Sequence, residues 1–236
     1  MPTDRCATDV IAERLSDHEK VPVHMDQLQL FAHGMFSNVY KGRLRLTNSN
    51  TKERKFVAVK KTWSDGMFLD HERPDNQFLI ADTSDRLTEV RILALLNRVQ
   101  HKNILQLLYH FSHKYPADNK VSNGLIFEFL PMSLTAYLKQ NNRKIDIFEI
   151  KLFVWQIFRG QMHLAKNSIC HRDLKPQNIL VDPESGVLKI GDFGSSKVIR
   201  VGVKNYSYHV TRYYRAPELI LDATHYGCEI GKFFSS

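Results

Sequence analysis

The residues with the clearest chemical potential lie between positions 170 and 194 of this 236-residue chain. Asp173 is followed by Asn178, and Asp192 comes after two apolar runs that are joined by the turn-rich segment 182–186. Apolar runs on either side of such a turn predict a β-hairpin, and a hairpin brings its two open ends together. We therefore expect Asn178 and Asp192 to be neighbours, with Asp173 on the loop that leads into the hairpin. Their side-chain oxygens could bind a hard cation such as magnesium, and Asp173 could receive the proton of an incoming hydroxyl group.

Two charged residues further upstream also stand out. Lys60 ends a predicted strand, 56–60, in which Ala58 and Lys60 share one face. Glu89 lies on the apolar stripe of a predicted helix over residues 84–99. A lysine at the end of a strand is usually solvated, whereas a carboxylate on an apolar stripe needs a cation to offset its lost hydration. The residues alone leave two interpretations of Lys60 open, a solvated charge or a functional one.

The composition is that of an ordinary folded protein, with 43% hydrophobic and 25% charged residues. No apolar run approaches the roughly 20 residues that cross a bilayer, the first residues lack a secretory signal, and three scattered cysteines indicate reduced thiols. We therefore expect a cytoplasmic or nuclear protein without a membrane partner. The formal charge of +8 fits either a protein that handles phosphate or a basic surface without a specific role. No basic motif interleaved with aromatic residues indicates a nucleic-acid partner, and nothing in the sequence indicates the oligomeric state.

The order of the predicted elements indicates an α+β protein with two unequal parts, because strands come first and helices later. Residues 1–24 are weakly patterned and are interpreted as a loose leader. The predicted elements are a hairpin over 28–46, the strand 56–60, the helix 84–99, strand-like runs at 104–111 and 125–130, and a helix over 145–166.

Three motifs carry a family resemblance. Residues 171–178 read His-Arg-Asp-Leu-Lys-Pro-Gln-Asn, residues 192–194 read Asp-Phe-Gly, and residues 216–218 read Ala-Pro-Glu. They resemble the catalytic loop, the metal-binding motif and the end of the activation loop of protein kinases. The resemblance implies a bilobal protein-kinase-like fold, with a β-rich N-lobe over 25–130 and a helical C-lobe from residue 131.

The resemblance also implies an activity, the transfer of the γ-phosphoryl group of ATP to protein hydroxyls with the help of Mg²⁺. Asp173 matches the catalytic base, and Lys175 matches the residue that steadies the transferring phosphoryl group. Asn178 and Asp192 match the residues that hold magnesium. Lys175 at this place is typical of serine/threonine kinases, so the implied acceptors are Ser and Thr hydroxyls of protein substrates.

The same resemblance assigns nucleotide-binding roles. Lys60 and Glu89 match the ion pair that places the ATP phosphates, and residues 63–82 match an insertion between them. The phosphate-covering loop, residues 32–39, reads Ala-His-Gly-Met-Phe-Ser-Asn-Val and keeps only the middle of three glycines, which predicts a weaker hold on ATP. The residues assigned to the nucleotide are Gly34, Val39, Ala58, Lys60, Glu89 and the backbone of Glu128 and Leu130.

Several segments between residues 192 and 218 are similar to the glycogen synthase kinase-3 group specifically. By that likeness Tyr208 is the tyrosine phosphorylated in the activation loop. Arg172 and Lys197 match two of the three basic residues that hold a substrate already carrying a phosphate, and the third place is taken by Thr88. Pre-phosphorylated protein substrates are therefore one alternative and unmodified ones the other.

The last residues depart from the family pattern. Gly231 falls where the family has an aspartate that ties down the catalytic loop, and 231–236 is a divergent tail. We therefore expect a partial C-lobe over 131–230, with the helical face around Phe153 and Ile157 lacking an obvious cover. Two hypotheses follow, an active serine/threonine kinase or a truncated, non-catalytic relative that acts by binding partners. Because phosphoryl transfer depends on accurate positioning, we expect the chain as it stands not to be a competent kinase.

Overall fold

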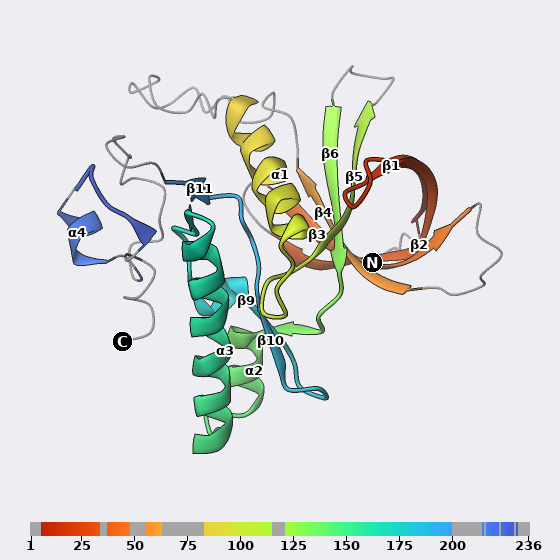
Figure 1. Cartoon of the computed structure of the whole chain (residues 1–236). Helices are drawn as coiled ribbons and strands as arrows, with labels where there is room; N and C mark the ends of the chain where they lie inside the picture. Colours follow the sequence, from red (N-terminus) through yellow and green to blue (C-terminus); the bar gives the residue numbers. More distant parts are fainter. Residues whose placement is uncertain are drawn as a thin grey trace, which may run out of the picture. The chain divides into compact units, whose positions relative to one another are not determined.

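The computed structural model describes residues 6–33, 37–47, 55–62, 83–114, 121–199, 214, 216–221, 223–228 and 230. The described residues divide between two compact units, one within 1–82 and 106–129 and the other within 83–105 and 130–236. The first unit is built of strands and the second carries the helices (Figure 1). The predicted α+β class is confirmed.

Six antiparallel strands of the first unit close into a barrel in the order β1-β2-β3-β4-β6-β5. The barrel closes where β1 pairs with β5, with Glu13 opposite His110. The hairpin predicted over 28–46 corresponds to the paired strands β2 and β3. The strands are β1 (Cys6–Arg14), β2 (Lys20–His33), β3 (Ser37–Leu46), β4 (Lys55–Thr62), β5 (Leu107–Lys114) and β6 (Val121–Glu128).

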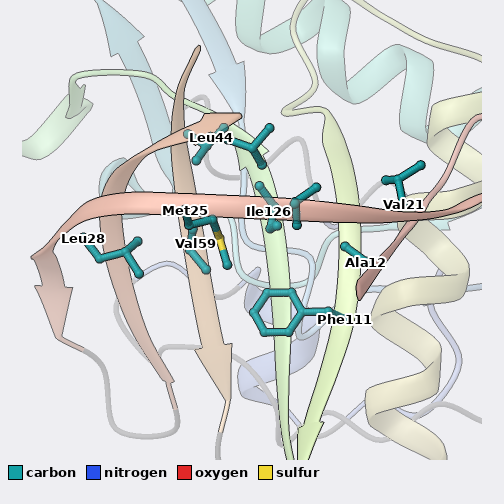
Figure 2. Close-up of a cluster of buried hydrophobic side chains, with 10 residues drawn as sticks. Ala12, Val21, Met25, Leu28, Leu44, Val59, Phe111 and Ile126 are labelled. Atoms are coloured by element: carbon teal, nitrogen blue, oxygen red, sulfur yellow. The ribbon is translucent and has the colours of Figure 1, made fainter. Parts of the chain in front are cut away.

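The barrel interior is filled by alternate residues of its strands, as the two-residue period of a strand requires. Val57 and Val59 of β4 are fully buried, while Ala58 and Lys60 between and after them are half-buried, so the predicted division of this strand into two faces is confirmed. Figure 2 shows the apolar side chains that meet in the interior. The buried cluster comprises Ala12, Val21, Val23, Met25, Leu28, Leu44, Val57, Val59, Phe111 and Ile126.

The structure differs from the prediction that residues 1–24 form a loose leader. Residues 6–14 form β1, and residues 20–24 begin β2. Ala12 is completely buried in the barrel core and Leu15 is 5% exposed. The local sequence pattern does not indicate this strand, because its buried residues are few and its pairing with β2 and β5 depends on the folded chain.

The second unit combines helices with small sheets. Its largest sheet has the order β10-β9-β7, and β8 pairs with β11. The helix α1, which the predicted division placed in the first part, belongs to this unit. The elements are α1 (Thr83–Arg98), β7 (Met132–Ser133), α2 (Leu134–Gln140), α3 (Ile147–Lys166), β8 (Ile169–Cys170), the 3₁₀ helix η2 (Pro176–Asn178), β9 (Ile179–Asp182), β10 (Val187–Ile190), β11 (Lys197–Val198) and α4 (Pro217–Ile220).

Two helices begin at residues whose side chains cap them. Ser133 accepts a hydrogen bond from the Ala136 amide at the start of α2, and Asp146 accepts one from the Phe148 amide at the start of α3. Such caps satisfy amides that have no partner within the helix. Together with the apolar period of residues 147–164, the Asp146 cap explains why the predicted helix over 145–166 is confirmed.

The expectation that the face around Phe153 and Ile157 lacks a cover is wrong. Both side chains are buried against the hairpin of β9 and β10 and against Leu134. The opposite face of α3 also carries apolar side chains, and these are exposed to solvent. Phe148, Trp155 and Met162 on that face are each more than half exposed.

Candidate active site

The hairpin of β9 and β10 sets the geometry of the candidate site. Ile179 pairs with Ile190, and the Gly191 amide donates to the Asn178 carbonyl at 2.8 Å. The hairpin was predicted, and the structure confirms it. Asn178 and Gly191 therefore lie side by side, and Asp192 follows directly at the open end, where the sequence predicted it.

The carboxylate of Asp173 is held by two other predicted site residues. Lys175 Nζ lies 2.7 Å from Asp173 Oδ2, and Asn178 Nδ2 donates to the same oxygen at 2.9 Å. Asn178 Nδ2 also donates to the Asp173 backbone carbonyl at 2.8 Å. Asp173 is only 9% exposed, so the cation and the amide replace hydration that burial removes. This arrangement keeps a carboxylate at a fixed place with a positive charge beside it.

His171 is a residue of this site to which the sequence assigned no role of its own. Its Nε2 donates to the Gly191 carbonyl at 2.9 Å, and its Nδ1 accepts the Asp173 amide at 3.3 Å. Burial lowers the pKa of His171 below its usual value, which agrees with a neutral ring that donates through one nitrogen and accepts through the other. His171 thus ties the loop that carries Asp173 to the end of the hairpin.

Two residues of the site adopt a left-handed backbone. Arg172 has a φ of 66° and Asp192 a φ of 55°, which non-glycine residues adopt only at some energetic cost. Arg172 Nε donates to the Ser195 carbonyl at 2.6 Å. Phe193 is 1% exposed and its ring meets that of His171 edge to face. These contacts hold the strained backbone, so that Asp192 stays exposed while its neighbour Phe193 is anchored.

The side chains that the structure describes at this site could supply one or two ligands to a magnesium ion that also binds a phosphate. They do not form a site in which protein atoms supply all the ligands. Among the described residues no group of three histidine, cysteine or acidic side chains could hold a metal ion. The hydrogen bonds from the Asn178 side chain to Asp173 both use its nitrogen, so its amide oxygen is the atom that could bind a cation. Asp192 is exposed beside it. Magnesium commonly binds one or two such protein oxygens and takes its other ligands from water and phosphates.

The residues assigned to the nucleotide are divided between the two units. In the barrel, Val39 of β3 lies opposite Lys60 of β4, and Ala58 lies opposite Phe127 of β6. Glu128, at the end of β6, is fixed because its amide donates to the Gln106 carbonyl at 3.2 Å and its Oε1 accepts the Gln106 amide at 2.8 Å.

In the second unit, Leu130 is buried and Glu89 is 9% exposed, next to the buried Ile92 and Leu93 of α1. The predicted apolar stripe around Glu89 is confirmed. Its pairing with Lys60 stays a prediction, because the two residues belong to different units.

Only some of the residues assigned to regulation, to the phosphate-covering loop and to the insertion are among those that the structure describes. Lys197, on β11, lies opposite Cys170 of β8 in the second unit, which also contains Arg172. Gly34, Tyr208 and the insertion at 63–82 lie outside the described residues.

The chain is similar to several known proteins. The family described as "Protein kinase domain" matches residues 26–233. The chain is 44% identical to "Protein kinase MCK1" of Saccharomyces cerevisiae over 143 residues, which are 59% of the chain and 38% of that protein. It is 31% identical over 228 residues to "Glycogen synthase kinase 1" of Pyricularia oryzae, covering 94% of the chain and 51% of that protein. It is also 31% identical over 215 residues to "Protein kinase gsk31" of Schizosaccharomyces pombe, covering 90% and 50%. The chain thus spans about half the length, or less, of these relatives.

Proposed function

The chain belongs to the protein kinase family, and we propose that it is a serine/threonine kinase of the glycogen synthase kinase-3 type, which transfers the γ-phosphoryl group of ATP to protein hydroxyls. One observation carries this proposal: the carboxylate of Asp173 is held between the Lys175 ammonium and the Asn178 amide. A fixed carboxylate beside a cation suits the acceptance of a proton from a hydroxyl group and the stabilisation of a transferring phosphoryl group.

Each site residue has a stated part in this proposal. Asp173 accepts the hydroxyl proton, and Lys175 offsets negative charge on the phosphoryl group as it moves. Asn178 and Asp192 would hold Mg²⁺, which supplies neutralisation of phosphate charge when bound. His171 orients the loop without touching the substrate, since both ring nitrogens are engaged with backbone groups.

The assignments for the nucleotide follow the family resemblance residue by residue. We propose that Gly34, Val39 and Ala58 line its site and that backbone groups of Glu128 and Leu130 bond the adenine. Lys60, paired with Glu89, would place the phosphates. The family generally uses ATP and Mg²⁺, which supports these assignments.

The substrate class can be proposed more finely. Lys175 favours Ser and Thr acceptors, and Arg172 and Lys197 supply two cations for a phosphate already on the substrate. We propose that such primed proteins are substrates and that Tyr208 is the site of activating phosphorylation.

No helix among the described residues is long and apolar enough to cross a membrane. We propose the cytoplasm or the nucleus as the place where the protein acts.

The test is a comparison of Asp173→Asn with Asp182→Asn. Asp182 is a matched control because its carboxylate accepts hydrogen bonds from Glu184 and Ser185 in the turn of the same hairpin. With Mg·ATP and a pre-phosphorylated serine peptide, Asp173→Asn should lower the rate of transfer by about 10²–10⁴-fold, while Asp182→Asn leaves it unchanged. Equal rates for the two variants would overturn the proposal. No transfer by the unsubstituted protein would also overturn it, and that is the outcome expected if the chain is the truncated, non-catalytic relative named above as the second hypothesis.

A further inference from the structure

Two cysteines that lie far apart in the sequence meet in one apolar cluster of the second unit. Cys170 is the last residue of β8 and is 3% exposed. Cys228 is half-buried and packs against the same cluster. No disulfide joins them. The cluster also contains Ala216, Leu219 and Ile230.

The two side chains interact directly. A hydrogen bond to Cys228, together with burial, raises the pKa of the Cys170 thiol. The thiol of Cys170 is therefore less acidic than that of an ordinary cysteine. Two sulfur atoms within hydrogen-bonding range need only a small approach to reach bonding distance. Cys228 is the more exposed of the two residues and is therefore the one that a peroxide reaches first.

We propose that Cys170 and Cys228 are a modification site at which a hydroperoxide forms a reversible disulfide. The thiolate of Cys228 attacks the peroxide O–O bond, which yields a sulfenic acid on Cys228 and releases an alcohol, or water when the oxidant is hydrogen peroxide. The sulfur of Cys170 then attacks the sulfenic sulfur and forms the S–S bond. The Cys170 proton leaves with the displaced hydroxide as water, so two thiols are oxidised by two electrons and the peroxide is reduced.

The bond would join two segments with different places in the fold. Cys170 immediately precedes His171 and Asp173, and Cys228 follows the short helix α4. Oxidation would therefore fasten the entry to the catalytic loop to the residues after α4. Any effect on phosphoryl transfer rests on the proposed function, whereas formation of the bond does not.

The experiment treats the whole chain with hydrogen peroxide, blocks remaining thiols, digests with trypsin without reduction and identifies the peptides by mass spectrometry. Cleavage after Lys and Arg places Cys170 in the peptide 167–172, Cys228 in 216–232 and Cys6 in 6–14. We expect a loss of two of the three thiols, a linked pair of the first two peptides, and recovery of both after dithiothreitol. The measurement needs no kinase activity, so its result is independent of the proposed function.

Three variants make the outcome decisive. Cys6→Ser should leave the linked pair unchanged. Cys170→Ala should abolish it and leave a sulfenic acid on Cys228 that reacts with dimedone, and Cys228→Ser should leave Cys170 largely unoxidised. A link between Cys170 and Cys228 of different chains, a link to Cys6, or independent oxidation of the two thiols would overturn the proposal.

Discussion

At the scale of single residues, the lowered pKa values of one buried and two half-buried histidines have the clearest consequence for stability. Burial lowers the pKa of His171, and it also lowers the pKa values of His101 and His163. The rings of His101 and His163 are stacked with centroids 4.8 Å apart, so a proton on one ring is opposed by a proton on the other. Nearby Arg159 and Lys166 lower these pKa values further. All three groups therefore bind fewer protons in the folded chain than in the unfolded one.

Acidification should consequently destabilise the fold. The unfolded chain binds protons as the pH falls through about 6.5, the ordinary pKa of histidine, while the folded chain does so only at lower pH. The free energy of unfolding should be fully retained above that pH and should decrease as the pH falls below it. The measurement is urea denaturation at a series of pH values.

The variant His163→Phe isolates the stacked pair. Phenylalanine keeps a ring against His101 and carries no proton, so the loss of stability on acidification should be smaller than in the unsubstituted chain. His225→Gln, at an exposed histidine, serves as the control and should leave the pH dependence unchanged. An unchanged pH dependence in His163→Phe would show that the stacked pair does not contribute.

The phosphate-covering loop supports a second prediction at this scale. Ala32 and Ser37 occupy places where the family has glycine, yet neither is among the described residues with a positive φ. The backbone conformation at these two positions therefore does not require glycine. Glycine would still have one advantage, because without a Cβ atom the backbone amides can approach the ATP phosphates more closely. Replacing both with glycine should tighten Mg·ATP binding severalfold in calorimetry. The control variant Gln29→Gly, at an exposed position of β2, should not change the affinity for ATP. If all the variants bind ATP with the same affinity as the unsubstituted chain, the two missing glycines do not weaken ATP binding.

At the scale of elements, α3 is joined to the hairpin by a buried polar side chain. Gln156 Oε1 accepts hydrogen bonds from Asn103 Nδ2 at 2.8 Å and from the Leu188 amide at 2.9 Å. Gln156 Nε2 donates to the Gly186 carbonyl at 2.8 Å, at the turn of the hairpin. Because buried polar groups are costly when unpaired, these bonds fix one arrangement of the helix, the hairpin and the loop before β5. The candidate catalytic residues depend on that arrangement, since they lie at the other end of the same hairpin.

Close packing at Gly160 supports a prediction for this interface. A Cβ atom there would lie 2.8 Å from Ile190 Cδ1 and 3.1 Å from the Asn103 carbonyl oxygen. Neither neighbour is free to move, because Ile190 is fully buried and the Asn103 oxygen accepts the Ile190 amide. Gly160→Ala should therefore destabilise the chain by about 1–3 kcal/mol, although alanine favours a helix by about 1 kcal/mol.

The double variant Gly160→Ala, Ile190→Val tests the cause. Valine lacks the Cδ1 atom that the new methyl group would meet, so the cost of Gly160→Ala should be smaller in that background. Chemical denaturation of the two single variants and the double variant gives the coupling energy. Strictly additive losses would mean that the contact with Ile190 is not the source of the strain.

At the scale of the whole molecule, each unit has its own apolar core, and β1 contributes to the core of the barrel. Ala12 is fully buried there, whereas its neighbour Ile11 is 62% exposed on the other face of the strand. Ala12→Asp places an unpaired charge in the core and should cost about 3–5 kcal/mol. Ile11→Asp introduces the same residue at a solvated place and should cost about 1 kcal/mol or less. Denaturation followed by circular dichroism compares them, and similar losses would place β1 outside the barrel core.

The sequence by itself determined the features that depend on local order. Three features were predictable from the sequence: the hairpin after Asp173, the two faces of β4 and the apolar stripe around Glu89. Each depends on turn residues or on a hydrophobic period of two or 3.6 residues, which involve only residues close together in the chain. The placement of Asn178 beside the open end of the hairpin follows from the same local rule.

Only the tertiary structure decided the contacts between segments that are distant in the sequence. The inclusion of residues 6–14 in a closed barrel depends on pairing with β5, about a hundred residues away. The burial of Phe153 and Ile157, the bonds of Gln156 and the meeting of Cys170 with Cys228 likewise require the folded chain. A local pattern can show that a side chain must be buried, but its partner is chosen by packing, which the pattern does not encode.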